Sequence, residues 1–322
     1  MNQFTKHLSK LTLALATSLA LTSGAVHAQV DTIKMLIPAN PAGGWDQTGR
    51  NLAQAMQQSG AVKTVNFENK GGAGGTIGLA QFVNSAKGDA NAVMIGGFVM
   101  VGAIALNKSP VNLTQVTPIA RLTSEYLALV VPAASPFKTL KDLTNALVAN
   151  PGAVAIAGGS AGGTDHMVAG IMTGLAGVEP SKVNYVPFAG GGDAINAILG
   201  GHVAAGISGV GEFSEQIKAG KVRALAVTSP TRVDGIPTFK EQGMDLDFGN
   251  WRGIFAAPGI TTAQRDVLIA TVKKSIEAPH WKTTLDKMGW TSVPLFGDDY
   301  KAAIASETVR AEKILASLNL KK

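Results

Sequence analysis

The sequence predicts an α/β fold in which two lobes enclose a ligand cleft. Three observations support this prediction. Short apolar strands alternate with amphipathic helices along most of the 322 residues, which is typical of a parallel or mixed sheet covered by helices. Glycine-rich turns repeatedly follow a strand and open a helix, at the positions where open α/β sheets bind ligands. Two of these turns lie in the first third of the chain and two in the middle third, as two lobes would require.

The first 28 residues predict a secretory signal peptide. Lys6 and Lys10 precede an apolar run over residues 11–21, and residues 26–28 offer small side chains at the cleavage positions. The apolar run is too short to span a bilayer, which needs about 20 residues. We therefore expect the mature chain to begin at Gln29 and to be exported to a bacterial periplasm.

The first third of the chain predicts alternating strands and helices. In the first helix, Leu52, Ala53 and Met56 share one face. The expected strands are 32–37, 65–68 and 93–95, and the expected helices are 46–58 and 76–86.

The middle third repeats this alternation. The segment 150–152 (Asn-Pro-Gly) ends one helix, and Asp193 is a natural N-cap for another. The expected strands are 127–131, 153–157, 184–187, 204–208 and 224–227, and the expected helices are 139–149, 166–176 and 194–199.

The last part of the chain predicts longer helices. Thr261 and Gln264 have the spacing of a capping box, and Asp298 can cap a long final helix. The strand 127–131 and the segment 250–256 are expected to cross between the lobes. This predicts lobe 1 from residues 29–126 plus 257–322 and lobe 2 from residues 127–256, with the ligand between them.

Four glycine-rich turns form the candidate binding site, at residues 41–46, 71–76, 158–165 and 190–193. Glycine permits a close approach of the backbone and a positive φ. The first turn of a helix presents unpaired N–H groups and the positive end of the helix dipole. Several such turns around one cleft would hold an anion without any charged side chain. A cleft lined by acidic side chains would contradict this expectation.

Composition excludes several kinds of chemistry. The chain has no cysteine, so disulfides and thiolate-bound metals are excluded. The net charge of +6 is scattered without a basic run, which does not indicate nucleic-acid binding. Beyond the signal peptide, only His166, His202 and His280 remain, and their wide spacing predicts no metal site. No nucleotide-binding motif has the right spacing, so no cofactor is expected.

One motif leaves a catalytic alternative open. Residues 158–162 (Gly-Gly-Ser-Ala-Gly) match the G-x-S-x-G pattern of serine hydrolases. No oxyanion loop precedes the motif, and Ser160 is favoured as a hydrogen-bond donor to a ligand. The residues available to complete a triad are His202, His280, Asp193, Asp245 and Asp247.

Side chains beside the turns allow two interpretations each. Trp45 follows the first glycine pair and Trp251 lies at a proposed lobe crossing, so each belongs either to the core or to a pocket wall. Asp46 and Asp165 are most simply N-caps, with a ligand contact as the alternative. His166 is expected to line the cleft or a lobe surface.

The two arginines near these turns are not equally good candidates for contacting a ligand. Arg50 lies one turn into the first helix and is more typical of a structural ion pair. Arg252 abuts the lobe crossing and is the better candidate for a bidentate contact with a carboxylate.

Taken together, the turns resemble those of the substrate-binding receptors of tripartite tricarboxylate transporters, also called Bug receptors. Segments 41–50, 68–78, 159–166 and 186–192 look like the family's ligand loops, and 135–140 also fits. The resemblance covers essentially the whole mature chain. The Gly-Gly-Trp-Asp of residues 43–46 is similar to the tricarboxylate-binding branch, although Gly49 stands where the family commonly has alanine.

The resemblance implies a periplasmic-binding-protein type II fold and a non-catalytic receptor. The expected ligand is a small organic polycarboxylate, with a citrate-like tricarboxylate favoured, and the expected partner is a membrane transporter of one large and one small subunit. We expect a monomer. A receptor that signals to a sensor kinase and a secreted serine hydrolase using Ser160 remain as alternatives. The residues expected to bind the ligand are Gly43, Gly44, Trp45, Asp46, Gly74, Gly75, Thr76, Ser160, Gly162, Gly163, Thr164, Asp165, His166, Gly191 and Trp251.

Overall fold

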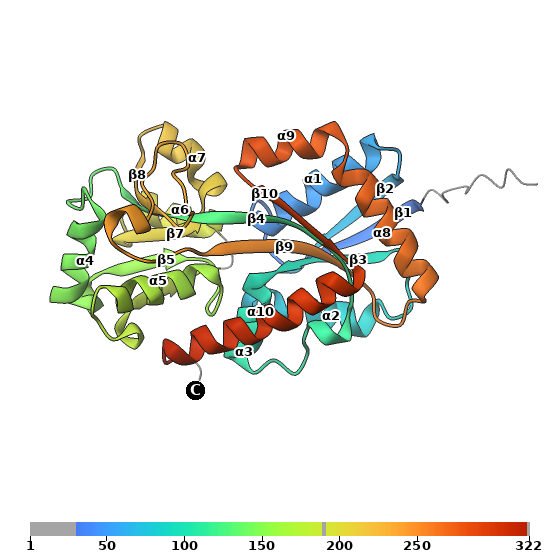
Figure 1. Cartoon of the computed structure of the whole chain (residues 1–322), viewed down its shortest axis with the longest axis horizontal. Coiled ribbons are helices and arrows are strands. Elements are labelled where there is room, and N and C mark those ends of the chain that lie inside the picture. Colours follow the sequence, from blue (N-terminus) through green and yellow to red (C-terminus); the bar gives the residue numbers. More distant parts are fainter. Residues whose placement is uncertain (1–29, 189–190, 321–322) are drawn as a thin grey trace, which may run out of the picture.

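The computed structural model describes residues 30–188 and 191–320 and has a mixed α/β fold (Figure 1). The prediction of an α/β protein is therefore confirmed. The strands are β1 (Val30–Ile37), β2 (Val62–Asn69), β3 (Ala92–Gly97), β4 (Thr117–Pro132), β5 (Ala155–Gly158), β6 (Asn184–Pro187), β7 (Ala205–Gly209), β8 (Val222–Val227), β9 (Gly249–Ala256) and β10 (Thr291–Phe296). The α-helices are α1 (Gly44–Gln58), α2 (Thr76–Ser85), α3 (Phe98–Asn107), α4 (Leu140–Ala149), α5 (Thr164–Leu175), α6 (Gly191–Leu199), α7 (Val210–Lys218), α8 (Thr262–Ile276), α9 (Pro279–Met288) and α10 (Gly297–Ser317).

The sheet has two halves that share β4. Its strand order is β2-β1-β3-β9-β4-β7-β5-β6, with β8 and β10 also paired to β4. Parallel pairs join β1 to β2 and β3, and β5 to β6 and β7, whereas β4 and β9 run antiparallel to their neighbours. We call β1, β2, β3, β9 and β10 the first half, and β5, β6, β7 and β8 the second half.

The long strand β4 connects the halves. Its residues Thr117–Tyr126 pair with β9, and its residues Leu127–Pro132 pair with β7 and β8. All of β9 pairs with β4 or β3, so strand pairing assigns Gly249–Ala256 to the first half. The predicted lobe division had placed residues 250–256 in the second lobe, and its two boundaries remain a prediction.

Among the described helices, α3, α7 and α9 were not predicted from the sequence. α3 is a case with a physical reason: Phe98, Met100 and Val101 on successive faces are all buried. A helix that is apolar on most sides lacks the periodic signal that reveals surface helices. α3 is buried because it packs against both α10 and α5, and so lies between the halves.

Two predicted caps are placed differently. Asp193 lies in the first turn of α6, and Asp298 lies in the first turn of α10, whose N-cap is Phe296. Asp298 instead forms an ion pair with Arg265 at 3.0 Å. The capping box of Thr261 and Gln264 is present as predicted. Within the described residues, no helix has the length and apolar character needed to cross a membrane.

Candidate ligand-binding site

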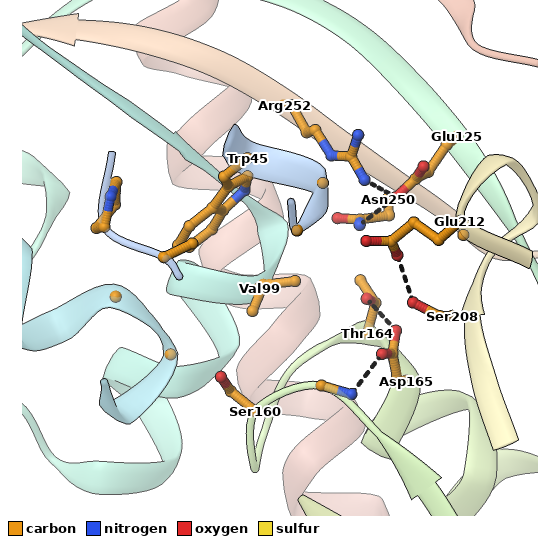
Figure 2. Close-up of a pocket in the computed structure, with 18 of the residues that line it drawn as sticks. Trp45, Val99, Glu125, Ser160, Thr164, Asp165, Ser208, Glu212, Asn250 and Arg252 are labelled. Atoms are coloured by element: carbon orange, nitrogen blue, oxygen red, sulfur yellow. Dashed lines mark hydrogen bonds and ion pairs between the residues drawn. The ribbon is translucent and has the colours of Figure 1, made fainter. Parts of the chain in front are cut away.

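A cavity of about 70 Å³ lies between the two halves, where the starts of several helices meet the strands that join the halves (Figure 2). The starts of α1 and α2 line it from the first half, and the starts of α5 and α7 line it from the second. Its lining residues are Pro38, Ala39, Gly43, Gly44, Trp45, Gly72, Gly74, Gly75, Val99, Glu125, Gly159, Ser160, Thr164, Asp165, Ser208, Gly209, Glu212, Asn250 and Arg252.

The halves touch each other around this cavity. Gly102 of α3 lies so close to the carbonyl of Gly162 that a Cβ at Gly102 would collide with it. The side chain of Asn40 donates a hydrogen bond to Asp193 at 3.4 Å across the same gap. Gly162 therefore serves the contact between the halves, where its φ of +74° also requires glycine.

The start of α1 brings a glycine, a tryptophan and an arginine together. Gly43 is the N-cap, and no side chain caps the helix. Gly44 packs directly under the guanidinium of Arg252, which a Cβ at Gly44 would strike. The indole of Trp45 is buried against Gly75 and forms part of the cavity wall. The first amides of α1 thus open into the cavity without a side-chain partner.

The start of α2 depends on two glycines with positive φ. Gly74 (φ +64°) belongs to the 3₁₀ turn η1 (Ala73–Gly75), and Gly75 (φ +87°) is the N-cap of α2, again without a side-chain cap. Both glycines line the cavity. The hydroxyl of Thr76 donates instead to the carbonyl of Ala73 at 2.9 Å, and Thr76 lies outside the lining.

The loop that enters α5 uses several of its amides internally. The N–H of Gly159 donates to Asp165 at 2.7 Å, and the N–H of Gly163 donates to the carbonyl of Ser160 at 3.0 Å. Gly162 donates to Nδ1 of His166 at 3.1 Å. Because these three amides are paired within the loop, the prediction that Gly162 and Gly163 offer amides to a ligand does not fit the structure.

His166 is part of the scaffold behind the cavity. Its ring stacks on Tyr185, with centroids 4.2 Å apart and planes within 3°. Burial lowers the pKa of His166 to about 4, so the ring is neutral at neutral pH and its Nδ1 can accept the N–H of Gly162. His166 is absent from the cavity lining, and its ring lies against Tyr185 of β6 and the N–H of Gly162.

The start of α7 is a contribution that the sequence analysis missed. Gly209 is the N-cap of α7, and Glu212 lies in its first turn. The hydroxyl of Ser208 donates a short hydrogen bond to the carboxylate of Glu212. A sequence signal for this turn exists, because Ser208–Gly209 lies between a strand and a helix as the other glycine turns do. It was missed because the turn contains a single glycine.

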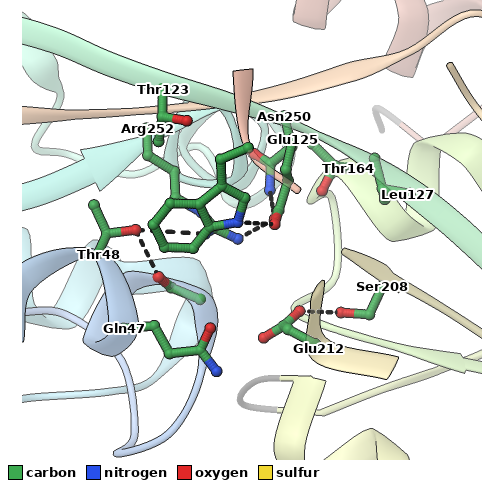
Figure 3. Close-up of polar contacts among 12 residues, drawn as sticks. Gln47, Thr48, Thr123, Glu125, Leu127, Thr164, Ser208, Glu212, Asn250 and Arg252 are labelled. Atoms are coloured by element: carbon green, nitrogen blue, oxygen red, sulfur yellow. Dashed lines mark hydrogen bonds and ion pairs between the residues drawn. The ribbon is translucent and has the colours of Figure 1, made fainter. Parts of the chain in front are cut away.

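A buried polar network joins β4, β9 and the loop before β10 behind the cavity (Figure 3). Glu125 accepts hydrogen bonds from Asn250 at 3.1 Å and from Nε1 of Trp290 at 3.1 Å, and it forms an ion pair with Arg252. The guanidinium also lies over the Trp290 ring, 4.8 Å from its centroid. Arg252, the predicted carboxylate clamp, therefore lines the cavity while bound to a carboxylate of the protein itself.

Trp251 does not reach the cavity. Alternate residues of a strand point to opposite faces, so Asn250 and Arg252 face the cavity and Trp251 faces the core. Its ring packs edge-on against Tyr300, with centroids 5.8 Å apart, and against Phe98 at 6.5 Å. The prediction that Trp251 binds the ligand is replaced by a core role for this residue.

Asp46 also has a structural role. It accepts the N–H of Ala42 at 3.0 Å and the side chain of Asn69 at 2.9 Å, and it forms an ion pair with Arg50 at 2.9 Å. Burial opposes ionisation, but these contacts hold the pKa of Asp46 below its ordinary value. Asp46 thus fixes the turn that precedes α1 and lies outside the cavity lining.

Three carboxylates line the cavity, which contradicts the expectation of a site without acidic side chains. Burial raises the pKa of Glu125 to about 7 against the lowering effect of Arg252, and burial also raises that of Asp165 to about 7. Asp165 and Glu212 lie in the first turns of α5 and α7. The helix dipoles expected to hold the ligand therefore also stabilise side chains of the protein.

No catalytic arrangement accompanies Ser160 in the described residues. Its hydroxyl lines the cavity, but the described histidines are engaged or placed elsewhere: His280 lies in α9 beside Thr284, and His202 follows α6. Nor do any three acidic or histidine side chains of residues 30–188 and 191–320 come close enough to hold a metal ion. Gly191 begins α6, and residues 189–190 of the fourth glycine turn lie outside the described residues.

The predicted site residues thus fall into two groups. Those that line the cavity are Gly43, Gly44, Trp45, Gly74, Gly75, Ser160, Thr164 and Asp165. Those outside its lining are Asp46, Thr76, Gly162, Gly163, His166 and Trp251. Whether Gly191 reaches the cavity stays a prediction, because its surroundings lie outside the described part of the chain.

Comparisons with known proteins agree with this architecture. A family model described as the tripartite tricarboxylate transporter family receptor matches residues 48–320. A protein of Pseudomonas sp. strain P51, described as the UPF0065 protein in the tcbD-tcbE intergenic region, is 27% identical over 316 residues, covering 94% of this chain and 93% of that protein.

Two solved structures show the same fold. The periplasmic binding protein BugD has a TM-score of 0.83 and 24% identity, covering 91% of this chain and 99% of its own. MatC from Rhodopseudomonas palustris with bound malate has a TM-score of 0.79 and 23% identity, covering 89% of this chain and 99% of its own.

These matches confirm the predicted receptor family and the predicted periplasmic-binding-protein fold. The family consists of receptors of tripartite tricarboxylate transporters, and it is not a family of enzymes. The chain has the fold of the periplasmic binding proteins, and it belongs to the tripartite tricarboxylate transporter receptor family.

Proposed function

We propose that this receptor binds a small organic acid in the cavity between its halves and delivers the acid to a tripartite transporter in the membrane. The observation that carries the proposal is the meeting of the starts of α1, α2 and α5 at one cavity. Each of these helices has a glycine N-cap and no side-chain cap. Amides of their first turns are therefore available to a carboxylate from two sides.

A small number of such donors would give useful affinity. A hydrogen bond to a charged group contributes roughly 1.5–3 kcal/mol. A micromolar dissociation constant corresponds to about −8 kcal/mol. Four to six such bonds would supply this free energy after the costs of association. The hydroxyl of Ser160, which also lines the cavity, adds a further donor.

The charge of the cavity bears on which acid is bound. The sequence favours a citrate-like tricarboxylate, but three carboxylates share the cavity with the single guanidinium of Arg252. Two like charges 4 Å apart repel by about 4 kcal/mol at an effective dielectric constant of 20. This repulsion favours an acid with one or two carboxylates over a fully ionised tricarboxylate. The bound malate of MatC, a dicarboxylate, is in keeping with that preference.

The remaining parts of the proposal concern export, assembly and motion. We propose that residues 1–28 direct export, that the mature chain is a monomer, and that its transporter has one large and one small subunit. The lobes of residues 29–126 plus 257–322 and of residues 127–256 would then open and close about β4 and β9. A receptor that reports to a sensor kinase is the alternative, and gene deletion separates the two roles by loss of uptake or loss of induction.

Isothermal calorimetry on the mature protein tests the proposal. The panel contains citrate, dicarboxylates, monocarboxylates, amino acids and neutral sugars. We expect binding of at least one carboxylate and none of the sugars. Binding of neutral or purely cationic solutes alone would refute the proposal. A fluorophosphonate probe should leave Ser160 unlabelled, because no described histidine activates it.

A further inference from the structure

We propose that the ligand carries a protonated amine beside its carboxylate, and that Glu212, Asn250 and Asp165 receive the amine. The ligand class is then the amino acids and other small amino-substituted acids. This inference rests on the proposed function, because it adds a second group to the same organic acid.

The cavity has one side rich in donors and one rich in acceptors. The glycine N-caps of α1 and α2 lie on the first side, next to Trp45. Side chains from α5, α7 and β9 form the other side. Figure 2 shows Glu212, Asn250 and Asp165 pointing toward the same part of the cavity. A ligand that is anionic at one end and a hydrogen-bond donor at the other would match both sides.

The side-chain oxygen of Asn250 is a buried hydrogen-bond acceptor to which no described residue donates. Its side-chain nitrogen donates to Glu125 at 3.1 Å, which fixes the orientation of the amide. Turning the amide over would set its oxygen against a carboxylate oxygen. The Oδ1 atom has no hydrogen-bond partner among the described residues, although Asn250 is only 6% exposed. A buried polar atom without a partner is costly, so a donor from the ligand would stabilise Asn250.

Glu212 supplies a negative charge without a cation. One of its oxygens accepts a hydrogen bond from the hydroxyl of Ser208, and the other accepts none from residues 30–188 and 191–320. No lysine, arginine or histidine of those residues forms an ion pair with Glu212. The carboxylate lies in the first turn of α7, at the positive end of the helix dipole.

Asp165 points toward the same part of the cavity as Glu212 and forms no ion pair in the described part of the chain. Burial raises the pKa of Asp165, and Arg252 opposes this only from beyond ion-pair distance. Both of its contacts are with neutral donors, the N–H of Gly159 at 2.7 Å and the hydroxyl of Thr164 at 3.0 Å. A protonated amine has three N–H donors. It could therefore serve Asp165, Glu212 and Asn250 together.

Glu125 has a different part in the cavity. Its carboxylate already accepts Asn250, Trp290 and Arg252, and Arg252 neutralises its charge. Glu125 thus positions Asn250 and Arg252 and leaves the amine to the other two carboxylates. A hydroxyl group in place of the amine would leave the charges of Glu212 and Asp165 uncompensated, because a hydroxyl brings no positive charge.

The test compares acids that share one carbon skeleton. Calorimetry on the mature protein measures aspartate, malate and succinate, then glutamate, 2-hydroxyglutarate and glutarate, then 4-aminobutyrate, 4-hydroxybutyrate and butyrate. We expect the amino acid of at least one set to bind about tenfold or more tightly than both of its partners. If hydroxy or unsubstituted acids bind best in every set, this inference fails and the proposed function stands. If no carboxylate binds, the proposed function itself fails.

A substitution on α7 gives a second readout. Glu212→Gln should weaken binding of the amino acid about tenfold or more, and it should leave unsubstituted acids unchanged or bind them more tightly. The matched control is Glu215→Gln on the same helix, where the side chain is 83% exposed and no effect is expected. Equal losses for amino and unsubstituted acids would overturn the inference.

Proton exchange on binding tests the unaltered protein. A cation placed beside Asp165 and Glu125 lowers their raised pKa values, so an amino acid should release protons near pH 7. An added carboxylate without an amine would cause proton uptake instead. Calorimetry in two buffers of different ionisation enthalpy measures the sign, and uptake with the tightest ligand would contradict the inference.

Discussion

The contact between Gly44 and Arg252 provides a sharp test of how the cavity is built. Gly44 is the first residue of α1, and a Cβ added there would strike the guanidinium of Arg252. Arg252 cannot move freely, because it is paired with Glu125 and lies over Trp290. The variant Gly44→Ala should therefore force Arg252 away from Glu125.

Two opposing effects set the magnitude. Alanine is favoured over glycine in a helix by about 1 kcal/mol, so helix propensity alone predicts stabilisation. Breaking a buried ion pair costs about 3–5 kcal/mol, because the remaining charge is left uncompensated. The buried pair outweighs the propensity, and Gly44→Ala should lose about 2–4 kcal/mol of unfolding free energy.

Urea denaturation measures this loss, with the m-value checked for two-state behaviour. The neighbouring Gly43 is the matched control, because its Cβ would lie 3.6 Å from the carbonyl oxygen of Asn40, an ordinary contact. Gly43→Ala loses only the preference for glycine over alanine at an N-cap, so it should cost no more than about 1 kcal/mol. If Gly44→Ala proves as stable as Gly43→Ala, Arg252 is not held as described and the reasoning is refuted.

Two further predictions concern backbone conformation and pH. Gly75→Ala should lower the melting temperature more than Gly60→Ala, because both have a positive φ but only the Cβ at Gly75 would strike the Trp45 ring; equal effects would rule out the clash. The unfolding free energy should fall as pH rises from about 5 to 8. In the folded protein Glu125 and Asp165 lose their protons only at about pH 7, whereas in the unfolded chain they lose them near pH 4. The folded state therefore binds more protons over this range, and its stability decreases as the protons are removed. The lowered pKa of His166 has the opposite but smaller effect, and a stability that rises over this range would contradict the burial of the two carboxyl groups.

The local parts of the site could be predicted from the sequence. A glycine-rich turn that links a strand to a helix is recognisable within a few residues, as around Gly43, Gly75 and Gly159. Their convergence followed from the rule that ligands bind at the carboxyl ends of strands. The secondary-structure prediction missed α3, which is buried on most sides, and it also missed the partly exposed helices α7 and α9.

The parts that depend on distant contacts could not be predicted in this way. Glu125 and Asn250 lie 125 residues apart in the sequence, yet they form one hydrogen bond. The use of the Gly162 amide by His166 depends on the detailed path of one loop. The choice of Trp251 was avoidable, because strand alternation assigns Asn250 and Arg252 to one face and Trp251 to the other.

The end of the last helix has a consequence for any motion of the receptor. α10 packs along α3, and Leu318, just after it, lies against Gly170 of α5 in the second half. The halves are thus bridged by the carboxyl-terminal segment as well as by β4 and β9. Any rotation that opens the cavity has to slide Leu318 off α5 or carry the end of α10 with it. A label or fusion attached at this terminus would therefore report on, or interfere with, opening, although it sits far along the chain from every ligand loop.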